Sequence, residues 1–428
     1  MPGNKKRSIQ LMTCVVIGSF VLNACSSSSK SPDTSADTTV ATTVATAASE
    51  VTVPSAGTTV AAAVGGNEVG AGIMAPDIGA ATAVGKGEGE LNLIAWAGYT
   101  EKAWVDPFTA ATGCKVNVKV GNTSDEMVQL IKTGDYDGVS ASGDASLRLI
   151  AAGDVAPVNT ALIPNYADVY PGLKGKPWNT VNTKSYGVPH GRGANVLMYN
   201  TDKVTPAPDS WSVVFDKTSP YKGAITAYDS PIYIADAAVY LMATQPDLKI
   251  TNPYALDATQ FAASVDLLKQ QKSNIGEYWS DFTKQQAAFK AGSSVVGTSW
   301  QIVANLAKAE GTKVEAVLPK EGATGWSDTW MIAATAKHPN CMYLWMDHII
   351  SPVANAAATE YFGEAPSNPK ACSKTADKTF CDAFHAGDED YFSKIWYWTT
   401  PIAACLDGRA VACTDYSEWT KAWTEIKG

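Results

Sequence analysis

Residues 91–120 read LNLIAWAGYTEKAWVDPFTAATGCKVNVKV, and this stretch decides the fold class. Its first five residues form a short apolar run, and Lys115 to Val120 alternates between valine and polar residues, as a strand with one buried face does. The residues between these runs have helical spacing and end at Gly113, a residue typical of a helix C-terminus. The stretch therefore predicts a strand, a helix and a second strand, the start of an α/β domain.

The same alternation continues along the chain. Residues 125–133 carry apolar side chains at helical spacing and stop at Gly134, and residues 136–140 then resemble a strand. An amphipathic helix is predicted around Phe261 to Leu268, and further strands are predicted at residues 223–228, 294–299 and 314–318. Alternation over about 340 residues exceeds what one hydrophobic core supports. We therefore expect an α/β fold with two lobes, each built on an open mixed sheet, and a cleft between them.

Open α/β sheets bind ligands at the carboxyl ends of their strands, so the residues just after each predicted strand are site candidates. These residues are aromatic, polar or acidic: Trp96, Ser142, Asp144, Asp229 and Trp300. Trp326 and Asp328 lie within residues 322–328, whose glycines predict a turn and not a core element. Aromatic faces attract an organic cation and a carboxylate neutralises its charge, so the combination predicts a cationic ligand. Packing or capping is the alternative role for each residue taken singly.

The N-terminus indicates export. Basic residues at positions 5–7 precede an apolar stretch of about 14 residues, shorter than the roughly 20 that span a bilayer. The stretch ends in Leu22-Asn-Ala-Cys25, which resembles the lipobox of bacterial lipoproteins, where the signal is cleaved before a cysteine that becomes lipidated. We expect a signal peptide over residues 1–24 and a lipid anchor on Cys25. An ordinary signal followed by a chance cysteine is the alternative.

A tether follows the predicted anchor. Residues 26–89 are rich in Ser, Thr, Ala, Val and Gly and contain no aromatic residue, whereas all 13 Trp and all 17 Tyr fall at or after Trp96. Such a composition buries too little apolar surface to offset the entropy lost on ordering. We therefore expect a disordered tether over residues 25–89. The alternative, a small β-rich domain, would lack core residues.

Charge and motifs exclude several function classes. The formal net charge is −9 and Lys and Arg are scattered, which argues against a nucleic-acid partner. None of the four His lies in a His-Glu-x-x-His motif, and the chain has neither a serine nucleophile elbow nor a phosphate-binding loop. Cys-x-x-Cys pairs typical of zinc sites are also absent. We expect neither an enzyme nor a metal or cofactor site.

Six cysteines follow the tether, and an even number in an exported chain predicts disulfides. They are Cys114, Cys341, Cys372, Cys381, Cys405 and Cys413. The short separations favour Cys372 with Cys381 and Cys405 with Cys413, and this leaves Cys114 for Cys341. Spacing alone does not determine the connectivity.

Several short segments together resemble one family. In chain order they are Trp96-Ala-Gly-Tyr99, Gly134-Asp-Tyr-Asp-Gly138, Gly187-Val-Pro-His-Gly-Arg-Gly-Ala194, Tyr221-Lys-Gly223, Gly297-Thr-Ser-Trp300, Pro319-Lys-Glu-Gly322, Trp326-Ser-Asp328 and Ala365-Pro-Ser-Asn368. With these segments the chain is similar to the bacterial extracellular solute-binding proteins of ABC importers, specifically the spermidine/putrescine-binding branch. The resemblance implies a two-lobed periplasmic-binding-protein fold of type II. It also implies that the lobes close on a polyamine, which a membrane permease then receives.

The resemblance also implies how the chain is divided. The first lobe would take residues 90–190 and 325–372, and the second lobe residues 191–324 and 373–428. Hinge bending is expected at about residues 188–193 and at two later crossings between the lobes. The protein would be a monomer outside the cytoplasm, held at the membrane by its lipid.

Residue roles follow from the matched positions. Trp96 and Tyr99 would form aromatic walls in the first lobe, and Trp300 and Trp326 would sandwich the ligand from the second. Asp328 and Asp229 would bind amine termini, and Ser142 would make a polar contact.

Three positions depart from the family pattern, because Ile232 replaces a Glu, and Asp144 and Glu364 each replace a Tyr. The acidic groups are thereby redistributed, and we count Asp144 and Glu364 among the ligand-binding candidates. Another organic cation, a sugar, or glycoside hydrolysis by Asp229 and Asp328 are the alternative functions.

Overall fold

The structure is a computed structural model that describes residues 73–428. The predicted signal peptide, Cys25 and most of the predicted tether lie outside these residues. The first sheet has the strand order β2-β1-β3-β14-β4, and β7 also pairs with β14. Its strands are β1 (Glu90–Ala95), β2 (Lys115–Val120), β3 (Gly138–Ala141), β4 (Val155–Ala156), β7 (Val188–Pro189) and β14 (Thr329–Ala333). The sheet is mixed, because β1 runs parallel to β2 and β3 whereas β14 runs antiparallel to β3.

In residues 73–428, four helices pack on this sheet. They are α1 (Lys102–Thr112), α2 (Ser124–Ile131), α3 (Gly143–Ala152) and α9 (Pro339–Ile349). Helix α10 (Pro352–Phe362) packs against two of them, α1 and α9. Helix α1 packs against α9, and α2 packs against α3. Gly113 ends α1 with a φ of 76°, a left-handed conformation that glycine adopts without strain. The β-α-β start predicted from residues 91–120 is therefore confirmed.

The second sheet forms the second lobe. Its strand order is β10-β9-β11-β8-β13-β16, and β12 and β15 also pair with β8. Its strands are β8 (Gly191–Asn200), β9 (Ile225–Tyr228), β10 (Ile275–Trp279), β11 (Val296–Trp300), β12 (Val314–Val317), β13 (Ala323–Trp326), β15 (Ala365–Pro366) and β16 (Ile395–Tyr397). Strand β8 is buried along its whole length, since it pairs with four other strands.

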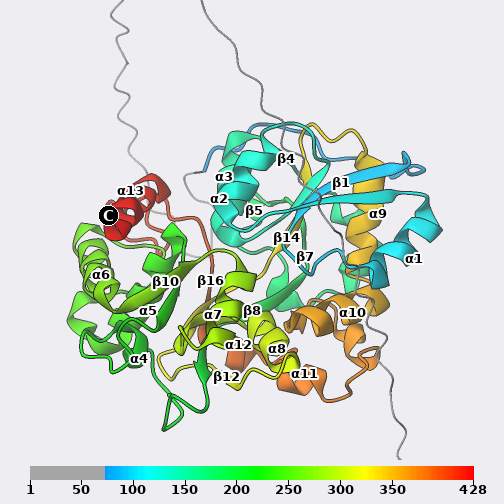
Figure 1. The fold of residues 1–428 in the computed structure, drawn as a ribbon. Coiled ribbons are helices and arrows are strands. Elements are labelled where there is room, and N and C mark those ends of the chain that lie inside the picture. The colour runs from blue at the N-terminus through cyan, green and yellow to red at the C-terminus, as the bar shows by residue number, and fades with distance from the viewer. Residues whose placement is uncertain (1–72) are drawn as a thin grey trace, which may run out of the picture. The chain divides into compact units, whose positions relative to one another are not determined.

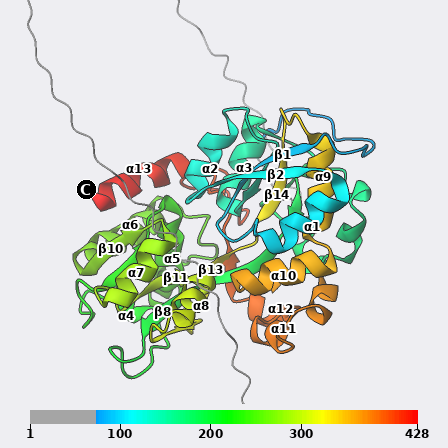
Figure 2. The same ribbon diagram turned by 45° about the vertical axis from the view of Figure 1, so that its right-hand side comes forward.

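Helices surround the second sheet, and both ribbon views show them beside the first lobe (Figures 1 and 2). They are α4 (Ser212–Phe215), α5 (Ile234–Thr244), α6 (Ala258–Gln271), α7 (Phe282–Ala291), α8 (Gln301–Ala309) and α13 (Tyr416–Lys427). Helix α13 packs on α6, so the end of the chain lies on the second lobe. Two short helices, α11 (Phe380–Ala383) and α12 (Glu389–Phe392), lie below α10 in Figure 2.

The chain passes between the sheets at several points. It passes from β7 to β8 through His190, and from β13 to β14 through residues 327 and 328. The His190 N–H donates to the Asp328 carbonyl at 2.8 Å, so these two crossings lie side by side. After β16, the Thr400 N–H donates to the Gly143 carbonyl of the first lobe at 3.1 Å. Two mixed sheets joined by such crossings confirm the predicted two-lobed α/β architecture, while the residue boundaries of the lobes stay predictions.

The predicted turn at residues 322–328 is wrong. Residues 323–326 form strand β13, which is buried and pairs with both β8 and β16. A side chain at Gly325 would collide with the backbone of Gly193, so the glycine permits the two strands to approach closely. Glycine content suggested a turn, but here it marks a close strand contact.

The predicted tether extends too far towards its C-terminal end. Residues 73–89 run along the first lobe in the structure. The Glu88 carboxylate accepts hydrogen bonds from the backbone of Asn340 and Cys341, each at 2.9 Å, and Lys184 pairs with Asp77 at 3.0 Å. Side-chain contacts of this kind order a segment whose composition alone favours disorder.

All three predicted disulfides are present. Cys114 pairs with Cys341, Cys372 with Cys381, and Cys405 with Cys413. The first of these joins residues 227 positions apart and links the end of α1 to α9. A link across so long a loop restricts the unfolded chain more than the two local bridges do.

Candidate functional site

Site candidates follow the ends of strands in both sheets. Trp96 comes directly after β1 and Ser142 directly after β3, whereas Trp300 and Trp326 end β11 and β13. Because β14 runs antiparallel to β3, its first residue lies opposite the last residue of β3. Asp328, just before β14, therefore meets Ser142, just after β3. Trp96, Ser142 and Trp300 therefore lie at strand ends as the sequence predicts, whereas Trp326 and Asp328 were expected in a turn.

Aromatic rings from the two lobes contact one another. The ring centroids of Trp96 and Trp300 are 5.8 Å apart in an edge-to-face arrangement. Trp300 lies 6.4 Å from Trp326, which in turn lies 6.1 Å from Phe362. Trp96 is 5% exposed and Trp326 is 2% exposed. Pairs of this geometry contribute about 0.5 to 1.5 kcal/mol beyond the area that they bury.

Asp328 is a buried carboxylate held by hydroxyl groups. One carboxylate oxygen accepts from the Ser142 hydroxyl, and the other accepts from the Tyr99 hydroxyl at 2.7 Å. Burial raises the pKa of Asp328 to about 7, although these two hydrogen bonds act in the opposite direction. Within residues 73–428, no Lys or Arg forms a salt bridge with Asp328. This acid therefore lies close to its titration point at neutral pH.

Glu364 extends the same network. Its carboxyl group accepts from the Trp326 indole at 3.1 Å and from the Tyr99 hydroxyl at 3.4 Å. Burial, and then the nearby Asp328, raise the pKa of Glu364 well above its usual value. Both effects favour the protonated form of Glu364.

His190 faces Glu364 but does not form an ion pair with it. The Nε2 atom of His190 is 3.3 Å from Glu364 Oε1, yet neither atom has a hydrogen bond of acceptable geometry among the described residues. The Trp330 indole donates to His190 Nδ1 at 3.1 Å, which assigns the proton of the neutral ring to Nε2. Burial lowers the pKa of His190 to about 3, so the ring is uncharged. His190 therefore supplies no cation to the acids of the site.

Asp144 is a further buried acid, close enough to Asp328 to affect its pKa. It is fully buried, and one of its oxygens accepts from the Ser124 hydroxyl at 2.8 Å. Its other oxygen has no hydrogen-bond partner among residues 73–428. Burial raises the pKa of Asp144 to about 6, against the opposing charge of Arg148. The proximity of Asp144 also raises the pKa of Asp328.

Asp229 is not brought into this group. Its carboxylate pairs with the Lys427 ammonium at 2.5 Å and accepts from the Trp423 indole at 3.1 Å. Both partners lie on α13, which packs against the short helix Pro231–Tyr233 that follows β9. In this structure the Lys427 ammonium already pairs with the Asp229 carboxylate. The role of Asp229 in binding a ligand amine stays a prediction.

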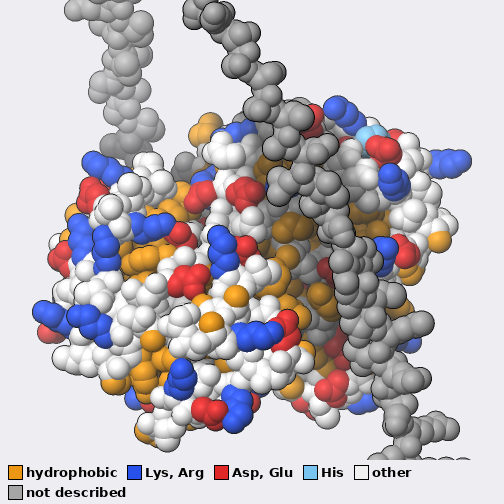
Figure 3. Space-filling model, in the orientation of Figure 1, with side chains coloured by type: hydrophobic (Ala, Val, Ile, Leu, Met, Phe, Trp, Pro, Cys, Tyr) orange, Lys and Arg blue, Asp and Glu red, His pale blue; other side chains and the backbone are white. Residues whose placement is uncertain are grey.

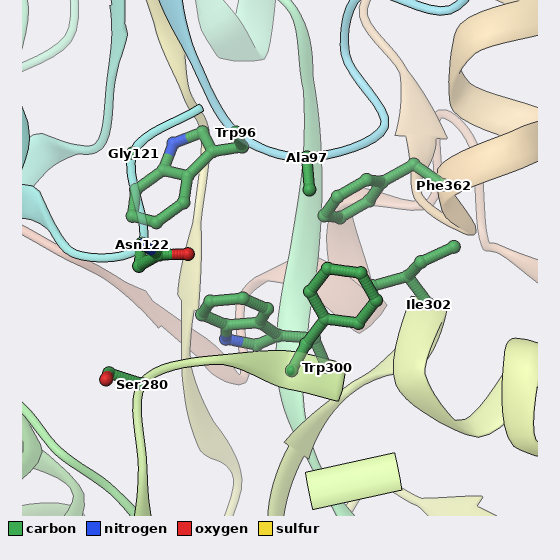
Figure 4. Close-up of a pocket in the computed structure, with 9 residues that line it drawn as sticks. Trp96, Ala97, Gly121, Asn122, Ser280, Trp300, Ile302 and Phe362 are labelled. Carbon is green, nitrogen blue, oxygen red and sulfur yellow. The ribbon is translucent and has the colours of Figure 1, made fainter. Parts of the chain in front are cut away.

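Two adjacent cavities lie among these residues. The acidic pocket is lined by Trp96, Ser142, Trp300, Trp326, Asp328, Phe362 and Trp398. The neutral pocket is lined by Trp96, Ala97, Gly121, Asn122, Ser280, Phe282, Trp300, Ile302 and Phe362. The two cavities share Trp96, Trp300 and Phe362. Figure 4 shows the neutral pocket, with Trp96 and Asn122 from the first lobe opposite Trp300 and Ser280 from the second.

Sequence reasoning missed several lining residues. Asn122 follows β2 and Ser280 follows β10, so the strand-exit rule would have found both had it been applied to every strand. Trp398 follows β16, a strand of three residues that gives too short a pattern to predict. Phe362 ends helix α10 and carries no such signal.

Residues 103–382 match the family described as bacterial extracellular solute-binding protein. The chain belongs to this family. The family and the fold are those of substrate-binding transport proteins and not of enzymes, which confirms the predicted family and the prediction that the chain is not an enzyme.

Relatives and solved structures agree with this membership. The spermidine/putrescine-binding periplasmic protein of Escherichia coli (strain K12) is 24% identical over 277 residues, which cover 64% of this solute-binding protein and 76% of that relative. A putative spermidine/putrescine ABC transporter structure from Listeria monocytogenes superposes with a TM-score of 0.67 at 19% identity, covering 79% of this chain and 99% of that chain. A lipoprotein of Treponema pallidum gives a TM-score of 0.65 at 16% identity, with coverages of 79% and 99%. These superpositions show that the chain has the two-lobed fold of the two solved structures.

Two further properties concern residues 73–428 only. Within residues 73–428, none of the helices combines the length and the apolar character that crossing a bilayer requires. In the same residues, no group of three or more His, Cys, Asp or Glu side chains is arranged to hold a metal ion. On the part of the face in Figure 3 that the structure describes, Lys and Arg are interspersed with Asp and Glu.

Proposed function

We propose that this solute-binding protein serves an ABC importer and captures an organic ammonium ion of the kind that polyamines exemplify. The observation that supports the proposal most is the surroundings of Asp328. This carboxylate is buried, has no Lys or Arg partner among residues 73–428, and lies in a pocket whose other walls are mainly indole rings. An ammonium ion pairs with the carboxylate and is attracted to the ring faces. A sugar would leave the buried charge without a counterion.

The ligand contacts follow from these surroundings. Asp328 pairs with the ammonium, and the faces of Trp96, Trp300 and Trp326 cover the carbon chain. Ser142 and Tyr99 donate to Asp328 and so orient its oxygens. Tyr99 therefore positions the carboxylate, in place of the role as an aromatic wall that the sequence predicts. Glu364 and Asp144 act through their neighbours and not by pairing with the ammonium.

Lobe closure completes the site. Trp96 belongs to the first lobe and Trp300 to the second, and their rings contact one another. A ligand that touches both rings therefore contacts both lobes only when the lobes are together. The ligand stabilises the closed form by the contacts that it gains there. The crossings at His190 and at residues 327 and 328 are the hinge, and a permease receives the closed form. No chemistry on the ligand is needed.

The proposed function also places the protein outside the cytoplasm, anchored to the membrane. Cleavage before Cys25 and lipidation of that cysteine would anchor a monomer to the outer face of the cell membrane, with the following residues as a tether. A diacyl chain anchors stably, at about 0.8 kcal/mol for each buried CH₂ group. Labelling cells with a radioactive fatty acid should mark the wild-type protein and not a Cys25→Ala variant. Equal labelling of both proteins would remove the anchor from the proposal.

A thermal-shift panel tests the ligand class. Only a ligand that binds the native state raises the melting temperature, so amines should raise it and neutral sugars should not. The panel should contain putrescine, spermidine, simple monoamines and sugars, each also measured against an Asp328→Asn variant. A shift with sugars, or with amines that Asp328→Asn leaves unchanged, would overturn the proposal.

A further inference from the structure

The two adjacent pockets differ in charge. Asp328 lies in the acidic pocket, and Glu364 is joined to it through the Tyr99 hydroxyl. Of the residues that line the neutral pocket, seven are Trp, Phe, Ile, Ala or Gly, and the other two are Asn122 and Ser280. No charged side chain is therefore present in the lining of the neutral pocket. The acidic groups of the cleft are gathered at one end.

The acids around the neutral pocket are already engaged by the chain. Glu126 accepts from the Asn122 side chain at 3.2 Å and lies 3.8 Å from the Lys119 ammonium. Asp281, the residue after Ser280, accepts from the Thr283 N–H at 2.9 Å at the start of α7. The Asp229 carboxylate pairs with Lys427 and accepts from the Trp423 indole. A ligand amine that paired with Asp229 would have to displace an ammonium that belongs to the chain.

A second ammonium in the neutral pocket would be costly. Moving a charged amine out of water requires a partner of opposite charge, and an apolar lining does not provide one. A hydroxyl or other neutral polar group has a far smaller desolvation cost and finds hydrogen-bond partners in Asn122 and Ser280. Figure 4 shows the Asn122 side chain directed between Trp96 and Trp300.

Resting on the proposed function, we propose that the cleft selects an amine with one charged head group and an uncharged tail, in preference to a linear polyamine charged at both ends. The head group pairs with Asp328 in the acidic pocket. The tail passes along the rings of Trp96 and Trp300, which line both pockets, and lies in the neutral pocket, where its end contacts Asn122 or Ser280. The ligand class is a monocationic, chain-like amine.

The lining of the acidic pocket agrees with a single head group. Among the described residues that line the two pockets, Asp328 is the one acid. Burial, and then the charge of Asp328, favour the protonated form of Glu364 by raising its pKa well above the usual value. Asp144 is buried behind this lining, near Arg148, whose positive charge opposes the rise in its pKa. Tyr99 and His190 are uncharged, because burial raises the pKa of the tyrosine and lowers that of the histidine.

A matched pair of probes tests the number of charges. Putrescine and 4-aminobutan-1-ol have the same chain length, but the second has a hydroxyl in place of one ammonium. Isothermal titration of the full folded protein should show 4-aminobutan-1-ol binding roughly tenfold more tightly than putrescine, since only putrescine brings an unpaired charge into the neutral pocket. Spermidine should bind no more tightly than putrescine.

A charge placed in the neutral pocket should reverse this order. The variant Ser280→Asp supplies a carboxylate there, and Ser280→Asn supplies the same shape without charge. In Ser280→Asp putrescine should bind roughly tenfold more tightly than 4-aminobutan-1-ol, a relative gain of about 100-fold, and in Ser280→Asn the wild-type order should persist. A gain in both variants would mean that shape and not charge decides, and would overturn the inference.

The remaining outcomes separate the two proposals. If wild-type protein binds putrescine or spermidine as tightly as 4-aminobutan-1-ol or more tightly, the preference for one charge is wrong while the capture of organic ammonium ions stands. If none of these amines binds to protein with a normal melting transition, the proposed function itself is wrong. Roughly tenfold preference for 4-aminobutan-1-ol, reversed only by Ser280→Asp, supports both.

Discussion

Asp328 and Asp229 are carboxylates beside strand ends in the same cleft-forming architecture, yet their surroundings are opposite. Asp328 is 3% exposed, has hydroxyl partners and is surrounded by indole rings. Asp229 is paired with the ammonium of Lys427 at the surface of the second lobe. A buried acid without a cationic partner costs free energy unless it is neutral or a ligand pairs with it, whereas a paired acid needs no ligand. The comparison shows that burial and pairing, and not residue type, mark the binding carboxylate.

The largest effect should come from making the same isosteric change at both acids. Asp328→Asn should weaken binding of 4-aminobutan-1-ol by about 100-fold or more, because it removes the charge that pairs with the ammonium. Asp229→Asn should change the affinity by less than about threefold, since that carboxylate pairs with Lys427. Isothermal titration measures both. Equal losses in the two variants would break the comparison.

The pH dependence of binding should belong to Asp328. Its pKa is raised to about 7 by burial, so the ligand-binding charged form is full at pH 8 and is progressively lost on acidification. Between pH 8 and pH 5.5 the affinity for 4-aminobutan-1-ol should fall about 30-fold, while the amine itself stays protonated. Asp144, with a pKa of about 6, acts in the same direction.

The raised pKa of Asp328 has the opposite effect on the stability of the unliganded protein, which falls as the pH rises. A carboxyl whose pKa is raised on folding is bound to its proton more tightly in the folded state, so stability falls as pH rises from about 4 through about 7. Asp328→Asn should lessen this fall in melting temperature and flatten the pH profile of binding. Profiles identical to wild type would show that another group titrates.

The aromatic contacts should matter less than the charge. Trp300→Ala removes a ring that contacts Trp96 across the cleft and should weaken binding about tenfold through lost cation–π attraction and lost apolar contact. Trp423→Phe removes only the indole donor to Asp229, and it should change the affinity less than about twofold. Isothermal titration of both variants compares the contribution of Trp300, at the pockets, with that of Trp423, beside Asp229. Circular dichroism verifies that each variant is folded. A larger effect of Trp423→Phe would contradict the assignment.

The smallest effect should come from the counterion of Asp229. Lys427→Met removes a partly exposed ion pair, which should lower the free energy of unfolding by about 1 kcal/mol or less. Binding of 4-aminobutan-1-ol should not change, since Lys427 lies outside both pockets. Urea denaturation and titration measure the two quantities. A strong loss of amine binding in this variant would place α13 in the binding site.

Much of the fold could be predicted because its signals are local. The alternation in residues 91–120 gave β1, α1 and β2 nearly to the residue, and the cysteine spacings were consistent with the observed bridges. Strand β13 was missed because its glycine serves a contact with β8, a strand more than a hundred residues away in the chain. Residues 73–89 were included in the disordered tether because the partners that order them, such as Asn340, are remote.

By itself, the sequence determined the α/β class and the fact that aromatic and acidic residues follow strands, and it favoured the cysteine pairs within short loops. These properties depend on hydrophobic period and on neighbouring residues, which a linear chain displays directly. Only the tertiary structure decided which acid is left to bind a ligand. Lys427 reaches Asp229 across 198 residues of sequence, and Tyr99 and Ser142 reach Asp328 across 229 and 186. Burial and pairing arise from such distant contacts, and no local pattern in the chain records them.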